Sequence, residues 1–310
     1  MEIKKYRIIG DIHGRENWQQ LVEPFDENTM YVFLGDFTDP YYGWEKVTYE
    51  QMIEQIKLMF TFKSEHPDNV IILYGNHDLQ YCVGEGETNR YEWRQDRRET
   101  LFNLFKNNEE LFGGVACHVG EKYLITHAGV TYDWYTRYCD YDVENLGKEP
   151  LGEICKHINK VWETNKAAFT FRANAMKMSD YYGTDSHHSP IWVRPDTLWE
   201  NNLFGFGDRV IQIIGHTPLD DYNDVKHETI NRIGTYGTFK RPATEDELEG
   251  NYLLDGTDIC CLKINDPTCV NIILADCLRR ETACVDIDVE TLEWSKYKVG
   301  EDVMDAKNLI

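Results

Sequence analysis

Short apolar runs recur along the first two thirds of the chain, and each ends in glycine or threonine followed by polar residues. The first run covers residues 6–9 and leads into Gly-Asp-Ile-His-Gly at positions 10–14. Similar runs occur at 30–34, 70–74, 123–126 and 210–214. Short, continuous apolar runs that end at turn-forming residues predict buried β-strands.

The segments between these runs have a helical period. Residues 45–63 place Ile53, Ile56 and Phe60 on one stripe, and residues 93–112 form a second helical region. Apolar strands that alternate with helices predict an α/β fold whose sheet is buried on both faces. Further strands are expected at 271–275, 283–287 and 294–299.

Residues 130–190 depart from this alternation. They are rich in aromatic residues, and apolar positions between 151 and 169 follow a helical period. We expect one domain over residues 1–310, with a helical insertion at about 130–190 that covers the site.

Composition restricts the class of protein. The net charge of −22 argues against a nucleic-acid partner, which would require basic patches to neutralise phosphates. No apolar run has the length of a membrane span, and no signal peptide precedes the first strand. The nine cysteines include no Cys-x-x-Cys pair, which favours free thiols in a reducing compartment. We therefore expect a cytoplasmic protein without a membrane partner.

The strand ends carry residues that commonly bind metals. In isolation, an aspartate at such a position is usually a helix N-cap and a histidine a hydrogen-bonded loop residue. Here five strand ends carry them together, at the edge where α/β sheets place their sites. A mixture of oxygen and imidazole donors suits Mn, Fe or Zn better than Ca or Mg. The residues are Asp11, His13, Asp36, Asp39, Asn76, His77, His127 and His216.

The ordered series GDIHG, GDFTD, GNHD, THAG and IGHT resembles the calcineurin-like metallophosphoesterases. It is most similar to their phosphoprotein-phosphatase branch, which includes the diadenosine tetraphosphate hydrolases. The resemblance implies a sandwich of two mixed β-sheets flanked by helices. It also implies two divalent ions, with manganese the first choice and iron or zinc as alternatives. The implied ligands are Asp11 and His13 for the first ion, Asp36 for both, and Asn76, His127 and His216 for the second.

The same resemblance assigns the catalytic groups. A hydroxide that bridges the metals would attack phosphorus in line, and His77 would act as general acid on the leaving-group oxygen. Asp39 would hold the His77 imidazole in the required tautomer.

One position departs from the family pattern. The related branch has Arg after the second motif's final Asp, where it clamps the substrate phosphate, whereas this chain has Pro40, which donates no hydrogen bond. Arg194, in the segment IWVRP, resembles a site-facing arginine of bacterial and phage relatives. We take Arg194 as the candidate residue that binds the substrate phosphate. The alternative is that Arg194 forms only a surface ion pair.

Three functions are consistent with these residues. The first is a phosphatase that acts on phosphomonoesters, with a phosphorylated protein or small molecule as its substrate. The second is a phosphodiesterase or dinucleoside polyphosphate hydrolase that uses the same metals. The third is a non-catalytic scaffold, against which the complete set of ligands and His77 argues.

Overall fold

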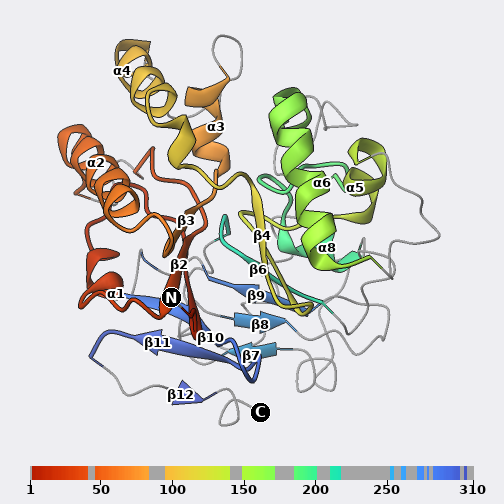
Figure 1. The fold of residues 1–310 in the computed structure, drawn as a ribbon. Coiled ribbons are helices and arrows are strands. Elements are labelled where there is room, and N and C mark those ends of the chain that lie inside the picture. Colours follow the sequence, from red (N-terminus) through yellow and green to blue (C-terminus); the bar gives the residue numbers. More distant parts are fainter. Residues whose placement is uncertain are drawn as a thin grey trace.

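The protein combines two mixed β-sheets with flanking helices, as the family resemblance implies (Figure 1). The structure is a computed structural model. It describes residues 2–40, 46–83, 95–139, 149–171, 185–200, 210–217, 252–254, 260–262, 271–275, 278, 282–300 and 304–305.

The first sheet has the order β12-β11-β10-β1-β2-β3 within the described residues. Strands β1, β2 and β3 are parallel, and the other three continue the sheet in antiparallel fashion. The bounds are β1 Lys5–Ile9, β2 Thr29–Phe33, β3 Val70–Ile72, β10 Ala283–Asp288, β11 Trp294–Lys298 and β12 Met304–Asp305.

The second sheet has the order β4-β5-β6-β9-β8-β7 in the same part of the chain. Its parallel centre is β5-β6-β9, and antiparallel strands lie on either side. The bounds are β4 Ala116–Val119, β5 Tyr123–Thr126, β6 Ile211–Ile214, β7 Tyr252–Leu254, β8 Cys260–Leu262 and β9 Asn271–Leu274.

Successive side chains of a strand point to opposite faces of the sheet, and in these strands the side chains on both faces are apolar. Ile8 and Val32 of the first sheet share one buried cluster with Ile125 and Ile213 of the second, so the two sheets face each other. The neighbouring residues, such as Phe33, pack in the other cluster, which contains the helices. This double burial explains why the strands are apolar without alternation.

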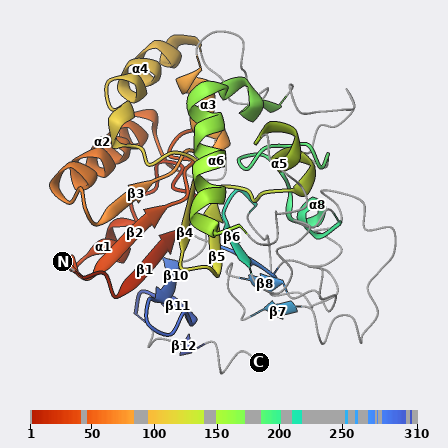
Figure 2. The same cartoon turned by 45° about the vertical axis from the view of Figure 1, so that its right-hand side comes forward.

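Helices cover the outer faces. Helices α1 and α2 lie beside β1–β3, and α6 packs against β4 and β5 (Figures 1 and 2). Helix α2 begins later than the apolar stripe suggests, because Thr48 and Gln51 form a capping box that starts it at Tyr49. The bounds are α1 Gln19–Val22, α2 Tyr49–Glu65, α3 Asn76–Cys82, α4 Gln95–Lys106, α5 Tyr132–Tyr138, α6 Leu151–Thr164 and α8 Pro195–Glu200, with 3₁₀ turns at Glu109–Leu111 and Lys166–Phe169.

The expected insertion contains helices α5 and α6. Residues 140–148 and 172–184 of it lie outside the described part of the chain. Asn159 of α6 receives hydrogen bonds from the backbone of Val115 and Ala116, which attaches this helix to the start of β4. That the insertion covers the site stays a prediction.

Among the residues that the structure describes, no helix has the length and apolar character needed to cross a membrane.

Candidate metal centre

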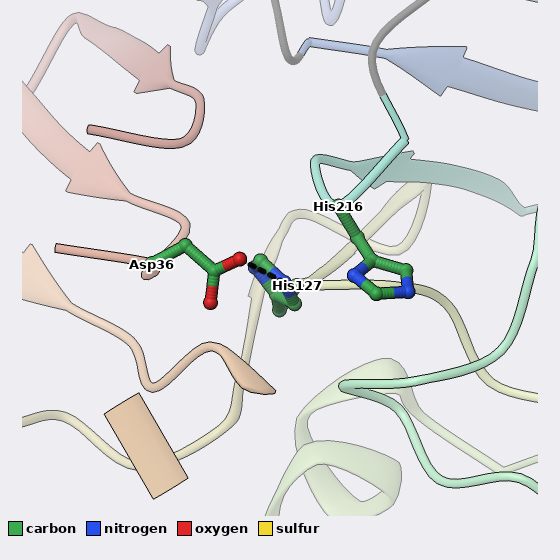
Figure 3. A group of neighbouring side chains, drawn as sticks. All are labelled: Asp36, His127 and His216. Atoms are coloured by element: carbon green, nitrogen blue, oxygen red, sulfur yellow. Dashed lines mark ion pairs between the residues drawn. The ribbon is translucent and has the colours of Figure 1, made fainter. Parts of the chain in front are cut away.

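The polar residues predicted at five strand ends meet at one place. Asp36 follows β2 of the first sheet, whereas His127 and His216 follow β5 and β6 of the second; ligand atoms of these three lie within 4.8 Å of one another (Figure 3). Asp11, His13 and Asp36 form a second group, whose ligand atoms also lie within 4.8 Å of one another. Asp36 therefore belongs to both groups, and every member is buried.

The backbone is strained where it presents these groups. His13, Asp36, Asp39 and His216 have φ values of 46°, 53°, 57° and 64°. Positive φ is uncommon outside glycine, and such strain gathers at functional sites. Within the described residues, Leu292 is the remaining non-glycine residue of this kind.

Backbone carbonyls orient two of the imidazoles. Nδ1 of His13 lies 2.7 Å from the Thr38 carbonyl oxygen, and Nδ1 of His127 lies 2.9 Å from that of Leu34. A nitrogen that faces a carbonyl must donate, so Nδ1 carries a proton in both rings and Nε2 is the nitrogen left to face a cation. The two Nε2 atoms lie 3.7 and 3.4 Å from Oδ2 of Asp36. Such carbonyl contacts are typical of metal-binding histidines.

His216 has the opposite arrangement. Its Nε2 lies 3.1 Å from the Trp192 carbonyl oxygen, which makes Nδ1 the nitrogen available to a cation. Its backbone N–H donates to both oxygens of Asp11 at 3.0 Å. Asn76 contributes Oδ1, which lies 2.9 Å from Nε2 of His127. Candidate ligands that follow strands of the second sheet are thus in direct hydrogen-bond contact with candidate ligands of the first.

The electrostatics fit cations at this centre. Burial lowers the pKa of His13 to about 3, and burial together with Arg194 lowers that of His216. Burial alone would lower the pKa of His127, but Asp36 and Asp11 raise it to about 9. Without metal, the site thus combines the neutral imidazoles of His13 and His216 and a protonated His127 with two buried carboxylates, and buried charges are normally paired or bound to metals. Carboxylate and imidazole donors suit a transition-metal ion.

His77 and Asp39 form a pair beside the centre. Nδ1 of His77 lies 3.1 Å from Oδ2 of Asp39, and the His77 ring meets His13 edge-on at 5.1 Å between centroids. The His77 backbone N–H also donates to Oδ1 of Asp36 at 2.9 Å. The imidazole is therefore held next to the shared carboxylate without itself belonging to either ligand group.

Arg194 lies against the loop that carries His216. Its Nη1 donates to the His216 carbonyl oxygen at 2.9 Å and to Oγ1 of Thr217 at 3.0 Å. The structure thus places a guanidinium next to the last ligand loop, and its charge contributes to the low pKa of His216.

Sequence reasoning missed Asp78, the final residue of the GNHD motif. Its buried carboxylate accepts three backbone N–H groups, from Asp36 at 2.7 Å, Phe37 at 2.9 Å and Gly75 at 3.0 Å. These bonds join the loop after β2 to the loop after β3. Burial, and then the charge of Asp36, raise the pKa of Asp78 to about 7. The position of Asp78 at the end of the GNHD motif was the sequence feature that could have indicated this role.

Two further residues that contact the site were also missed. Gln80 and Tyr81 of helix α3 both donate to the carboxylate of Asp39. The signal for them was their spacing of three and four residues from His77, which places all three on one side of a helix.

Comparisons with known proteins identify the family to which most of this chain is similar. The model of a family described as calcineurin-like phosphoesterase matches residues 5–251. Serine/threonine-protein phosphatase PP1-delta of Caenorhabditis elegans is 30% identical over 132 residues, which make up 40% of this chain and 39% of that protein. A solved serine/threonine phosphatase of Saccharomyces cerevisiae, described as similar to human phosphatase PP5, is 18% identical, with a TM-score of 0.39. That match covers 69% of this chain and 61% of the other, so the chain spans less than two thirds of either relative.

Proposed function

Because this chain belongs to the calcineurin-like phosphoesterase family of hydrolases, we propose that it is a dinuclear metal-dependent phosphatase acting on phosphomonoesters. The family match confirms the resemblance read from the ordered motifs. The observation that carries the proposal is the double membership of Asp36 in two buried groups of ligand-type atoms. One shared carboxylate is what a pair of closely spaced ions requires.

In this proposal, Asp11, His13 and Asp36 hold one ion, and Asp36, Asn76, His127 and His216 hold the other. Two bound divalent ions would polarise the phosphoryl oxygens and lower the pKa of a water molecule. The protein itself would hold the carboxylate, amide and imidazole ligands in place and in the required tautomers. Carbonyl contacts set the imidazole tautomers, and Asp78 joins two of the ligand loops.

The leaving group requires a proton. When water attacks phosphorus, the bond to the leaving oxygen breaks, and His77 donates its Nε2 proton to that oxygen. Asp39 holds Nδ1–H at 3.1 Å, which leaves Nε2 as the donor and stabilises the protonated ring. Solvent then returns the proton to His77.

Arg194 is the proposed phosphate-binding residue. Pro40 cannot donate a hydrogen bond at the position where the related branch has arginine. The guanidinium of Arg194 is held beside His216 by its two bonds to residues 216 and 217. A planar guanidinium matches phosphate oxygens better than an ammonium group does.

A substrate panel tests the proposal. The Mn²⁺-loaded protein is assayed with p-nitrophenyl phosphate, a phosphopeptide, bis-p-nitrophenyl phosphate and diadenosine tetraphosphate, with Asp36→Ala as the inactive control. We expect hydrolysis of the monoesters and its loss in EDTA. Faster turnover of the diester or the dinucleotide would overturn the monoester assignment, and activity retained in Asp36→Ala would overturn the dinuclear site.

A further inference from the structure

One face of helix α3 converges on a single carboxylate. His77, Gln80 and Tyr81 are spaced i, i+3 and i+4, so they lie on the same side of the helix. All three bond to Asp39, which belongs to the loop after β2. The helix that carries the imidazole therefore also carries the groups that hold its partner.

The two oxygens of Asp39 have different partners. Oδ1 accepts the Tyr81 hydroxyl at 2.7 Å. Oδ2 accepts the Gln80 amide and faces Nδ1 of His77 at 3.1 Å. A carboxylate rotates easily about its last bond, but rotation here would break contacts on both oxygens. Pro40 follows Asp39 and has no N–H group, so side chains from α3 supply these donors.

Tyr81 is well suited to this role. Its side chain is buried, and its ring stacks on Phe105 with 6.4 Å between centroids. Packing fixes the ring, and the hydroxyl is thereby aimed at Asp39. Removal of the hydroxyl alone would keep the ring packing and leave a buried carboxylate oxygen with one donor fewer.

We propose that Tyr81 and Gln80 are positioning residues that hold Asp39 so that the His77 imidazole faces the leaving-group oxygen. This inference rests on the proposed function, in which His77 is the general acid. Neither residue touches the substrate in this account. Their effect reaches the reaction through Asp39 and His77, so it should appear only where the leaving group needs a proton.

The test compares Tyr81→Phe with His77→Asn on aryl phosphates of increasing leaving-group pKa. The loss of a hydrogen bond to a charged group corresponds to about a ten- to hundredfold change, and here the Gln80 amide still holds the other oxygen. We expect Tyr81→Phe to lose about tenfold in kcat on poor leaving groups and almost nothing on good ones. The matched control is Tyr123→Phe, which removes another buried hydroxyl, bonded to the Leu292 carbonyl at 2.9 Å. Its profile should equal that of the wild type.

Two further measurements separate positioning from a general loss of structure. In the double variant His77→Asn/Tyr81→Phe, the tyrosine change should have no added effect, because its route to the substrate is gone. In metal-free protein with ¹⁵N-labelled histidine, the His77 Nδ1–H resonance should shift or exchange faster in Tyr81→Phe. Tyr123→Phe should leave it unchanged. If Tyr81→Phe fails to fold, Gln80→Met removes the other donor and takes its place.

The outcomes are distinguishable. If His77→Asn itself loses activity equally on good and poor leaving groups, the acid role in the proposed function is wrong. If His77→Asn shows the leaving-group dependence but Tyr81→Phe and Gln80→Met reduce all substrates equally, or none, the positioning role is overturned.

Discussion

Gly215 lies so close to Asp11 that the methyl group of Gly215→Ala should displace the Asp11 carboxylate and prevent one metal ion from binding. A Cβ atom at Gly215 would lie 2.1 Å from Oδ1 of Asp11, whereas ordinary contacts begin at 3.4 Å. Gly215 does not have a positive φ, so alanine introduces no backbone strain there. Gly215→Ala is therefore a steric test of one ligand.

The magnitude follows from these distances. To reach ordinary contact, the Asp11 oxygen must move by about 1.3 Å, whereas metal–ligand distances tolerate about 0.2 Å. The two bonds from the His216 backbone N–H to the Asp11 carboxylate would be lost as well. A misplacement of about 1 Å can cost about a hundredfold in rate. We expect at least that loss in kcat/KM.

Gly75→Ala should act on both ions. A Cβ atom at Gly75 would lie 2.1 Å from Oδ1 of Asp36, the residue that belongs to both ligand groups. Asp11 belongs to one group. Gly215→Ala should therefore retain about one Mn²⁺ per chain after loading and gel filtration, whereas Gly75→Ala should retain almost none.

The assay is elemental analysis of the loaded variants together with kcat/KM on p-nitrophenyl phosphate. Circular dichroism and thermal unfolding check that the variants fold. Gly152→Ala is the matched control, because Gly152 lies in helix α6 and a Cβ there meets only the His118 side chain, at 3.2 Å. Two ions per chain and wild-type activity in Gly215→Ala would refute the reasoning.

Three further predictions concern other parts of the structure. Arg194→Lys should lose about ten- to a hundredfold in kcat/KM, nearly as much as Arg194→Ala, with unchanged metal content, because an ammonium lacks the planar fork; kinetics equal to the wild type would contradict the phosphate-binding role. In calorimetric titrations in buffers of different ionisation enthalpy, metal binding should release about one proton more per chain at pH 7.5 than near pH 10, because His127 has a pKa of about 9 without metal and must lose its proton to bind. Equal proton release at the two pH values would contradict the assignment. Arg7→Met should lower the free energy of unfolding by about 3–5 kcal/mol, because it leaves the buried Asp286 without its two-bond partner. Denaturant titration checks this, and Arg7→Met/Asp286→Leu should recover most of the loss.

Local sequence determined the continuously apolar strands and the identity of the candidate metal-binding residues. The runs at 6–9, 30–34 and 123–126 lie within one residue of strands β1, β2 and β5, because a strand buried on both faces must be continuously apolar. The chemistry of a carboxylate or imidazole is likewise a property of the residue, so the kind of site could be read from strand ends alone. Short or polar strands such as β4, with His118 at its centre, gave no such signal.

The tertiary structure alone decided which of those residues meet. Gly215 and Asp11 are about two hundred positions apart, and their contact depends on how the second sheet lies against the first. The contacts of Tyr81 with Asp39 and of Arg194 with His216 are also tertiary, because they join segments that are 42 and 22 positions apart in the sequence. Periodicity in a sequence reports which side of an element is buried, but it contains no information about the partner element. The distances that place Asp36 in both groups of candidate ligands arise only when the two sheets pack on their common core.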